Sequence, residues 1–278
     1  MLHLRHWLSD RKEITRKGVR VLITGASSGI GKALAFEFAQ KGAILTLTSR
    51  RRSALHRVAI EIQEKHPNLK KPLVVSCDIS KNEDVERLIA RCVEQMGGID
   101  ILINNAGISV YGKTDRTTLQ DFHSVMDVNF FGSLHCIFGV LPYMKKRGKG
   151  LIVNIASVAA LHGVPYLGAY GASKAALSTL CQSLRAEWLK YGVEFMLVYP
   201  DYTQSKIFRN EKKVGGACRP PGPYTPANKV AETIVDSIEG HKKEIVLSLR
   251  GKALKVLQGI HPNFVDKKMV KIAYRLEN

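Results

Sequence analysis

Residues 19–40 read VRVLITGASSGIGKALAFEFAQ. The apolar run at 19–23 predicts a buried strand, a glycine-rich turn follows at 24–31, and residues 32–40 have the composition of a helix. Many such turns carry glycine for steric reasons alone. Here the glycines lie between a strand and a helix N-terminus, whose unpaired N–H groups and positive dipole end favour phosphate. The segment therefore predicts a phosphate cradle at the start of an α/β domain.

The alternation of strand and helix continues along the chain. Six further apolar runs predict strands, and the segments between them predict helices. The expected strands cover residues 42–49, 73–77, 99–103, 150–155, 193–199 and 244–249, and the expected helices cover 53–66, 85–96, 114–138, about 170–190 and 226–239. This order predicts α/β architecture with a Rossmann-type, doubly wound parallel sheet of about seven strands and helices on both faces.

Three arginines follow the second expected strand, at residues 50–52. In a dinucleotide-binding unit an acidic residue at this point holds the ribose 2′-hydroxyl, whereas an arginine accommodates a 2′-phosphate. Ser49 and Arg50 therefore favour NADP(H) over NAD(H). The alternative is that the arginines open a solvated helix, although positive charge in a first helical turn opposes the helix dipole.

Two later strands also end in polar or small residues. Asp78-Ile79-Ser80 follows the third strand and Asn104-Asn105-Ala106-Gly107 follows the fourth. Open α/β sheets bind ligands at the carboxyl ends of their strands, so these residues are candidates for the same site. Asp78 could accept from an adenine amino group or cap the next helix, and Ser80 with Glu83 forms an expected capping box.

Catalytic chemistry is predicted for Tyr170 and Lys174, with Ser157 thirteen residues upstream of the tyrosine. Residues four apart on a helix project from one face, so an ammonium can lie beside a phenol. A phenol ordinarily ionises near pH ~10, and a neighbouring cation lowers its pKa toward working pH. Ser157 would hold and polarise a carbonyl oxygen. The alternative is a solvated helix face that carries a tyrosine and a lysine.

Length and composition limit the class of protein. With 278 residues and 45% hydrophobic residues, the chain suits one domain with short extensions. Five scattered cysteines without a CxxC pair predict neither disulfides nor a metal site, which fits a reducing compartment. No apolar run reaches the roughly 20 residues of a membrane span, and the start is too polar for a secretory signal. A cytoplasmic location is expected.

The net charge of +18 predicts an anionic partner, such as a cofactor phosphate, an acidic protein or an anionic lipid surface. Nucleic acid is not expected, because no nucleic-acid-binding module is present. Basic residues concentrate in an N-terminal extension, 1–17, and a C-terminal extension, 251–278, on either side of one domain at 18–250. The C-terminal apolar residues recur at helical spacing, which predicts two basic amphipathic helices. These helices could contact an anionic membrane peripherally, or pack on the domain or a twin subunit.

Taken together, the motifs closely resemble those of the short-chain dehydrogenase/reductase family over about residues 18–249. The matching motifs are TGxxxGxG at 24–31, NNAG at 104–107, Asn129, Ser157 and YxxxK at 170–174. The resemblance implies that Tyr170 is the catalytic acid/base and that Lys174 lowers its pKa and holds the nicotinamide ribose. It also implies that Ser157 positions the substrate oxygen and that Asn129 anchors a water in a proton relay.

The family pattern also implies which residues line the NADP(H) site. They are Gly25, Ser27, Ser28, Gly29, Ile30, Gly31, Arg50, Arg51, Asp78, Ile79, Asn105, Ala106, Gly107, Tyr170, Lys174, Pro200 and Ser205. The chain departs from the pattern at Ser28, where many NADP-preferring members have a basic residue, and at Pro200-Asp201, where Pro-Gly is usual. Its terminal extensions resemble those of microsomal members that act on steroids or long-chain lipids.

The expected function is that of an NADPH-dependent reductase that interconverts a ketone and a secondary alcohol. An irregular segment at 201–225 is the expected substrate lid, and its Ile207 and Phe208 favour a hydrophobic substrate such as a steroid or a long-chain 3-keto compound. The alternatives are a reductase of 3-ketoacyl groups on a carrier protein, or a dinucleotide-sensing or structural protein without turnover. A homodimer or homotetramer is expected from the family.

Overall fold

The computed structural model describes residues 17–205, 207, 211–217, 219, 222 and 224–277. Nearly all of the expected N-terminal extension, together with Phe208, Cys218 and the prolines at 220, 221 and 223, lies outside these residues. Of the cysteines, Cys77, Cys92, Cys136 and Cys181 are described, and all of these are free and buried.

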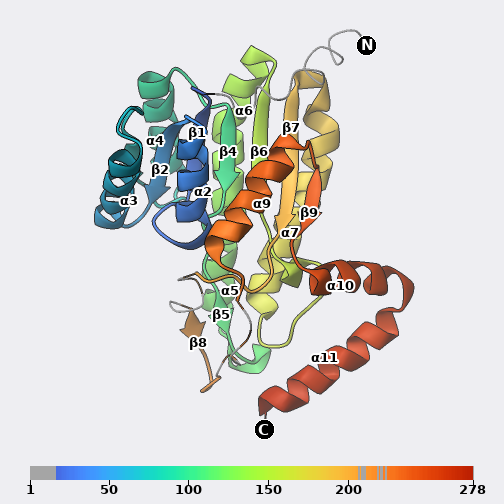
Figure 1. Ribbon diagram of the computed structural model, residues 1–278. Helices are drawn as coiled ribbons and strands as arrows, with labels where there is room; N and C mark the ends of the chain where they lie inside the picture. The colour runs from blue at the N-terminus through green and yellow to red at the C-terminus, as the bar shows by residue number, and fades with distance from the viewer. Residues whose placement is uncertain are drawn as a thin grey trace.

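A seven-stranded parallel sheet forms the centre of the molecule, as predicted (Figure 1). Its strand order is β3-β2-β1-β4-β6-β7-β9, so the order reverses between β1 and β4. The strands are β1 (Arg20–Thr24), β2 (Ile44–Ser49), β3 (Leu73–Ser76), β4 (Ile101–Asn104), β6 (Gly150–Ile155), β7 (Val193–Tyr199) and β9 (Glu244–Val246). The continuous burial of β4 and β6 explains why these strands read as unbroken apolar runs rather than as alternating patterns.

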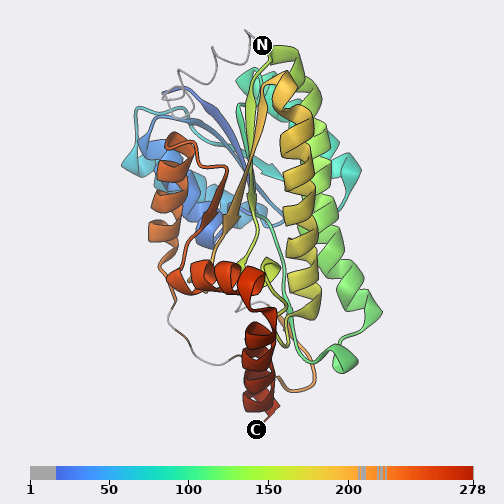
Figure 2. The same ribbon diagram turned by 90° about the vertical axis from the view of Figure 1, so that its right-hand side faces the viewer.

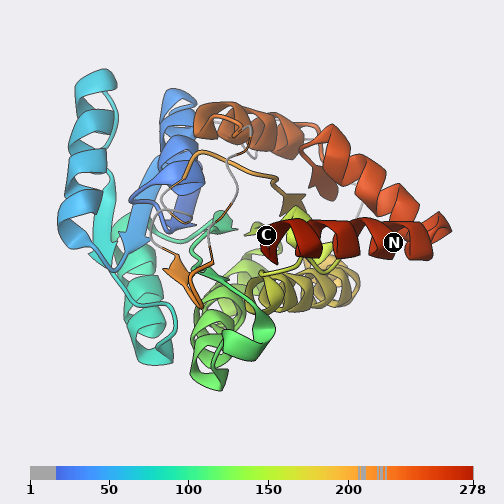
Figure 3. The same ribbon diagram turned by 90° about the horizontal axis from the view of Figure 1, so that it is seen from below.

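Helices cover both faces of the sheet (Figure 3). One apolar core lies under α2 (Gly29–Gln40), α3 (Arg52–Lys65) and α9 (Ala227–Glu239). The other lies under α4 (Asn82–Met96), α6 (Gly132–Arg147) and α7 (Gly168–Trp188). Short 3₁₀ turns complete the connections at η2 (Thr114–Arg116), η4 (Val158–Ala160) and η5 (Leu189–Tyr191). Because both faces of the sheet are packed, the carboxyl ends of the strands are held in fixed positions relative to one another.

The long helix expected at 114–138 is divided and shifted along the chain. It consists of α5 (Leu119–Met126), a π-helical turn η3 (Asp127–Phe131) and α6. Thr118 and Asp121 form a capping box at its start. By length and composition alone, Leu119–Arg147 passes as a candidate membrane span, with 44% of its most apolar window buried inside the protein. Core helices pass the same test, and this one packs on α4 and α7.

Two expected helix caps are wrong. The Ser80 hydroxyl and N–H both donate to Asp78 Oδ1, at 2.8 and 3.2 Å, so Ser80 closes a local turn and α4 begins after Lys81. The pair Thr225-Pro226 predicts a cap at Thr225, but α9 begins at Ala227 after Pro226, and the Thr225 N–H and C=O bond to the backbone of Tyr202 and Gln204 at 2.9 Å each. Thr225 instead joins the two ends of the expected lid.

The C-terminal residues form the two expected helices, α10 (Leu249–Ile260) and α11 (Pro262–Glu277). Both lie beyond the carboxyl ends of the strands (Figure 1, Figure 2). Ser248 caps α10 by accepting from the Gly251 N–H at 2.9 Å, which is why β9 stops at Val246 rather than at the expected residue 249. A second, two-stranded sheet pairs β5 (Val110–Tyr111) with β8 (Lys212–Lys213) from the lid.

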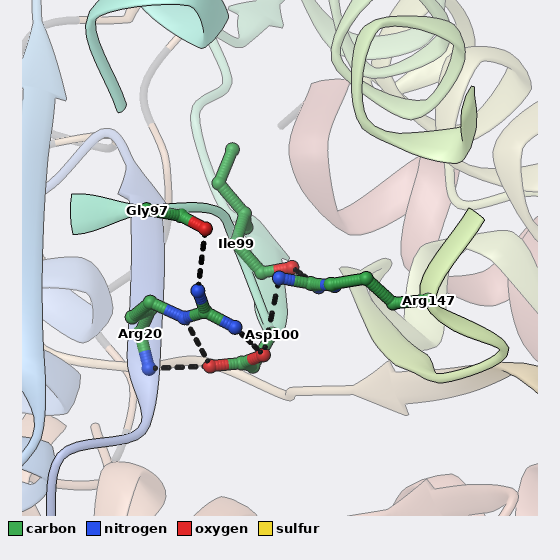
Figure 4. Close-up of polar contacts among 5 residues, drawn as sticks. All are labelled: Arg20, Gly97, Ile99, Asp100 and Arg147. Carbon is green, nitrogen blue, oxygen red and sulfur yellow. Dashed lines mark hydrogen bonds and ion pairs between the residues drawn. The ribbon is translucent and has the colours of Figure 1, made fainter. Parts of the chain in front are cut away.

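At the other end of the strands, where β1 and β4 begin, ion pairs hold the structure together. Asp100, at the start of β4, accepts from Arg20 Nε at 2.7 Å and Nη2 at 2.6 Å, and Arg147 Nη1 lies 3.4 Å away (Figure 4). Arg147 also donates to the Ile99 carbonyl. This cluster fastens β1, β4 and the end of α6 together, far from the carboxyl ends of the strands.

Candidate active site

One cavity of about 520 Å³ opens at the carboxyl ends of the strands. Its lining contains nearly all of the residues expected at the site from the sequence. These are Gly25, Ser27, Ser28, Gly29, Ile30, Arg50, Arg51, Asp78, Ile79, Asn105, Ala106, Gly107, Ser157, Tyr170, Lys174, Pro200 and Ser205. The two exceptions are Gly31 and Asn129, which lie behind the cavity wall.

The glycine-rich turn leaves no room for side chains. Gly25 and Gly29 have φ of +65° and +56°, a region that favours glycine. A Cβ at Gly29 would lie 2.8 Å from Ser205 Cβ, and one at Gly31 would lie 2.4 Å from Asn105 Nδ2. Gly31 therefore allows close packing of α2 against the strand ends, while Gly25 and Gly29 bring the N-terminus of α2 to the cavity.

Hydrogen bonds between neighbouring strands hold this turn in shape. Asn105 Nδ2 donates to the Thr24 carbonyl at 2.9 Å and to the Gly25 carbonyl at 3.3 Å. Thr24 Oγ1 accepts from the N–H groups of Asn105 and Ala106 at 2.9 and 3.0 Å. Asn105 and Ala106 of the NNAG motif thus support the cradle structurally, and the cradle is a surface that fits a pyrophosphate.

Arginine side chains lie beside the turn. Arg51 Nη2 is 3.4 Å from Ser27 Oγ, and the Arg51 N–H is 3.3 Å from Ser49 Oγ. Arg51 precedes α3 rather than standing inside it, and both Arg50 and Arg51 line the cavity. Two guanidinium groups and two hydroxyls at the end of β2, with no carboxylate among residues 49–52, suit an anionic group on a ribose.

The three polar side chains of the expected catalytic group meet inside the cavity. The Ser157 and Tyr170 side chains line the cavity together, and the interaction with Ser157 favours the ionised form of the Tyr170 phenol. Lys174 Nζ donates to the Ile155 carbonyl at 2.8 Å and lies 5.9 Å from the centre of the Tyr170 ring. Both Tyr170 and Lys174 are buried, at 7% and 3% exposure. A serine, a phenol and an amine are therefore grouped where water has little access.

The acidities of Tyr170 and Lys174 follow from burial. Burial raises the pKa of Tyr170 above its ordinary value, and the hydrogen bond from Ser157 and the charge of Arg219 act in the opposite direction. Burial lowers the pKa of Lys174 to about 8. The sequence predicts a lowered Tyr170 pKa, but burial outweighs the effects that lower it, and Lys174 Nζ donates to the Ile155 carbonyl.

Asn129 lies in η3 and has no exposed surface. Its Nδ2 donates to the Ile108 carbonyl at 3.0 Å and to Ser173 Oγ at 2.9 Å, and its Oδ1 accepts from the Ile108 N–H at 2.8 Å. Its amide therefore fastens the segment after β4 to α7. The π-helical turn, a feature frequent at functional sites, carries this residue next to Gly107 and the wall of the cavity.

Several lining residues were not expected as site residues. Met269 and Ile272 of α11 reach the cavity, and so do Tyr202 and Arg219 of the expected lid. Asp201, which stands where the family usually has glycine, accepts from Ser248 Oγ at 2.7 Å and so ties the lid to the cap of α10. The apolar spacing of the tail signalled a buried helix face, but no local pattern showed which surface it covers.

Known proteins share this sequence pattern and this architecture. A family profile described as short chain dehydrogenase matches residues 19–214. A Drosophila melanogaster protein named dehydrogenase/reductase SDR family protein 7-like is 34% identical over 272 residues, which cover 94% of this chain and 82% of that protein. The 3-ketodihydrosphingosine reductase of Bos taurus is 34% identical over 215 residues, which cover 77% of this chain and 65% of the bovine protein. A short-chain dehydrogenase/reductase structure from Burkholderia phymatum, in complex with NAD, matches with a TM-score of 0.80 at 25% identity and covers 89% of this chain and 95% of that chain.

Proposed function

Because the chain belongs to the short-chain dehydrogenase/reductase family of oxidoreductases, we propose that it reduces a ketone to a secondary alcohol with NADPH, in a reversible reaction. The proposal is carried by one observation. Ser157, Tyr170 and Lys174 line the same cavity as the glycine turn and Arg51. A proton donor and a surface for a dinucleotide phosphate thus share one enclosed space, where a bound ketone and a nicotinamide would meet.

The residues of the chain supply proton transfer and orientation. When bound, NADPH supplies the hydride that adds to the carbonyl carbon. The Ser157 hydroxyl donates a hydrogen bond to the carbonyl oxygen and polarises the C=O bond. Tyr170 gives its proton to that oxygen, and it is protonated at neutral pH because burial raises its pKa. Lys174, held by the Ile155 carbonyl, contributes positive charge beside the phenolate that remains.

The choice of NADP(H) rests on residues 49–52, where a ribose 2′-phosphate would meet arginines and hydroxyls. Arg50→Asp should lower the ratio of kcat/KM for NADPH over NADH by about 10- to 100-fold, since a carboxylate repels the phosphate and accepts from a ribose hydroxyl. Arg57→Asp, on the exposed surface of α3, is the matched control. An unchanged ratio in Arg50→Asp would reject the assignment of the 2′-phosphate to this position.

A hydrophobic ketone is the proposed substrate. The cavity is lined by apolar side chains from several elements, namely Val164, Leu167, Ile207, Met269 and Ile272, and the first three pack in one cluster with Tyr170. Similarity to the bovine 3-ketodihydrosphingosine reductase supports a lipid-like substrate of this kind.

NADPH consumption should be measured with a panel of steroid ketones, 3-keto sphingoid bases, 3-ketoacyl thioesters and small aromatic ketones. We expect a clear preference for a long or polycyclic ketone. A preference for small aromatic ketones would contradict the substrate class, and tight NADPH binding without turnover would favour a sensing role.

We also propose a peripheral contact of α10 and α11 with an anionic membrane at its cytoplasmic surface. Their exposed side chains include Val256, Ile260, Phe264, Val270 and Tyr274, and the lysines at 267, 268 and 271 lie among them. Sedimentation with vesicles containing phosphatidylserine, compared with vesicles of phosphatidylcholine alone, tests this contact. Binding should weaken when these three lysines are changed to glutamate, and equal binding to both vesicle types would reject it.

We propose that the chain forms a homodimer or homotetramer through the outer face of η3 and α6. Phe131, Phe138 and Tyr143 are 44%, 57% and 40% exposed on this face. Sedimentation equilibrium should show an oligomer that Phe138→Glu dissociates. A monomeric wild-type protein would reject this surface as a self-association interface.

A further inference from the structure

The lid contains a buried ion pair between Glu211 and Arg219. Arg219 Nε and Nη2 donate to the two carboxylate oxygens of Glu211, at 2.9 and 2.6 Å. The side chains are 0% and 5% exposed, so both charges have left water. This two-pronged geometry is the strongest form of an arginine–carboxylate contact, and it fixes the plane of the guanidinium.

The guanidinium side of the pair faces the active site. Arg219 lines the cavity together with Tyr170, whereas Glu211 does not. The central carbon of the guanidinium lies 4.4 Å from the ring centre of Tyr111 and 5.7 Å from that of Tyr202. Tyr111 and Tyr170 belong to the same small apolar cluster. A cation is therefore held against the ring of Tyr111, which packs in the same apolar cluster as Tyr170, and both Arg219 and Tyr170 face the one cavity.

Stability gives no sufficient reason for this arrangement. Removing two charges from water is costly, and a well-packed apolar pair in place of a buried ion pair is often equally stable or more stable. A buried charge is, however, poorly screened, so its field acts on neighbouring groups. The Arg219–Glu211 pair is a dipole of fixed direction, with its positive end on the side of the cavity.

The other titratable groups around the phenol are few among the described residues. The elements around Tyr170 contribute Lys174 on its own helix, the phenols of Tyr111, Tyr166 and Tyr202, the lid pair itself, Asp201, which accepts from Ser248, and, farther along α5 and η3, Asp121 and Asp127. Asp121 is already paired with Lys212 at 2.7 Å. Arg219 is thus a second cation for the phenol, independent of Lys174.

We propose that Arg219 is a positioning residue that acts through Tyr170, with its guanidinium stabilising the phenolate left after proton transfer and Glu211 holding it and limiting its effect. The proposal rests on the proposed function, because it assigns Tyr170 the proton transfer. The directions of the electrostatic effects agree with it. The charge of Arg219 lowers the pKa of Tyr170, and the charge of Glu211 raises it by a smaller amount.

Two variants should shift the pKa of Tyr170 in opposite directions. Glu211→Gln keeps the cation and removes the opposing anion, so the pKa of Tyr170 should fall by about one unit. The double variant Glu211→Gln with Arg219→Met removes both charges while keeping the side-chain volumes, so the pKa should rise above the wild-type value. Arg219→Lys retains the charge without the two-pronged contact, and it should keep the pKa near wild type while raising KM.

The primary measurement is the pH titration of phenolate absorbance, taken as the difference between each protein and its Tyr170→Phe counterpart. The secondary measurement is the pH at which alcohol oxidation reaches half its maximal rate. Asp121→Asn is the matched control, because it frees Lys212 and loosens the lid anchor at β8 without changing a residue that lines the cavity. Its phenolate titration should stay at the wild-type position.

The outcomes distinguish a failure of this inference from a failure of the proposed function. Opposite shifts in the two charge variants, with none in Asp121→Asn, would support the role of Arg219. Titrations that coincide in wild type, Glu211→Gln and the double variant would overturn it, and so would an equal shift in Asp121→Asn. If wild type turns over no ketone but the titrations shift as expected, the proposed function fails and the electrostatic effect on Tyr170 remains.

Discussion

Asp100→Asn should destabilise the fold while leaving the active site intact. Asp100 accepts from the Arg20 N–H at 3.0 Å, Nε at 2.7 Å and Nη2 at 2.6 Å, and it also faces Arg147 at 3.4 Å. Asparagine has nearly the same shape but no charge, and its amide group would point donors at a guanidinium. Two arginines would then lie close together without the anion between them.

The expected loss of stability is about 2–3 kcal/mol. Hydrogen bonds to charged groups contribute roughly 1.5–3 kcal/mol each, and the asparagine oxygen can keep part of this set. The Asp100 and Arg20 side chains are about one-fifth exposed, at 20% and 21%, so solvent screening reduces the sum. For a domain of this size such a loss lowers Tm by about 5–10 °C.

The loss should also depend on pH. The contacts with arginine hold the pKa of Asp100 below its ordinary value. A carboxylate with a lowered pKa adds stability above its unfolded pKa of about 3.9, and this stability disappears as the pH falls through the folded pKa. The difference between wild type and Asp100→Asn should therefore be full at about pH 7 and smaller at about pH 3.5.

Urea unfolding at these two pH values measures the difference. Asp115→Asn is the control, because its carboxylate is 71% exposed and lies 3.9 Å from Arg116, and no change is expected. Below its melting temperature, Asp100→Asn should be as active as wild type, because the cluster lies at the opposite end of the strands from the active site. If Asp100→Asn and wild type were equally stable at neutral pH, the conclusion that this cluster stabilises the fold would be refuted.

Two further predictions concern the active site. Ketone reduction should fall as the pH rises through about 8, because buried Lys174 loses its proton there, and a rate that stays constant from about pH 7 to 9 would show that its charge is not needed. Gly29→Ala should raise the KM for NADPH at least about 10-fold, because a Cβ there meets Ser205 at 2.8 Å and φ is positive, whereas Gly163→Ala, with no neighbour within 4 Å, should leave it unchanged. An unaltered KM in Gly29→Ala would show that the turn can adjust.

Local sequence patterns were enough to predict the sheet and the glycine-rich turn that forms the cradle. The glycine turn, the apolar runs and the four-residue spacing of Tyr170 and Lys174 depend on neighbours in the chain, so they are visible without tertiary structure. The sequence alone does not show what the amide of Asn129 bonds to inside a helical segment. Its partners, the backbone of Ile108 and the hydroxyl of Ser173, come from other elements and satisfy its amide.

Features that depend on distant contacts could not be predicted. Arg219 contacts Tyr111, which is distant in the sequence, and no local pattern marks this pair. Met269 belongs to the periodic apolar face of the tail, but that spacing does not show that the face reaches the cavity. The capping error at Ser80 has a local cause, since Asp78 offers the same hydroxyl a nearer acceptor. The unusual Asp201 became interpretable only when its partner, the cap residue Ser248, was in view.

The most direct test of the proposed mechanism compares wild type with Tyr170→Phe. Phenylalanine keeps the ring in its apolar cluster and removes only the hydroxyl that faces the cavity with Ser157. NADPH-dependent reduction of the preferred ketone should fall at least about 100-fold, while NADPH binding measured by fluorescence should change less than about threefold. Turnover within a few-fold of wild type in Tyr170→Phe would contradict the role of this phenol as the proton donor.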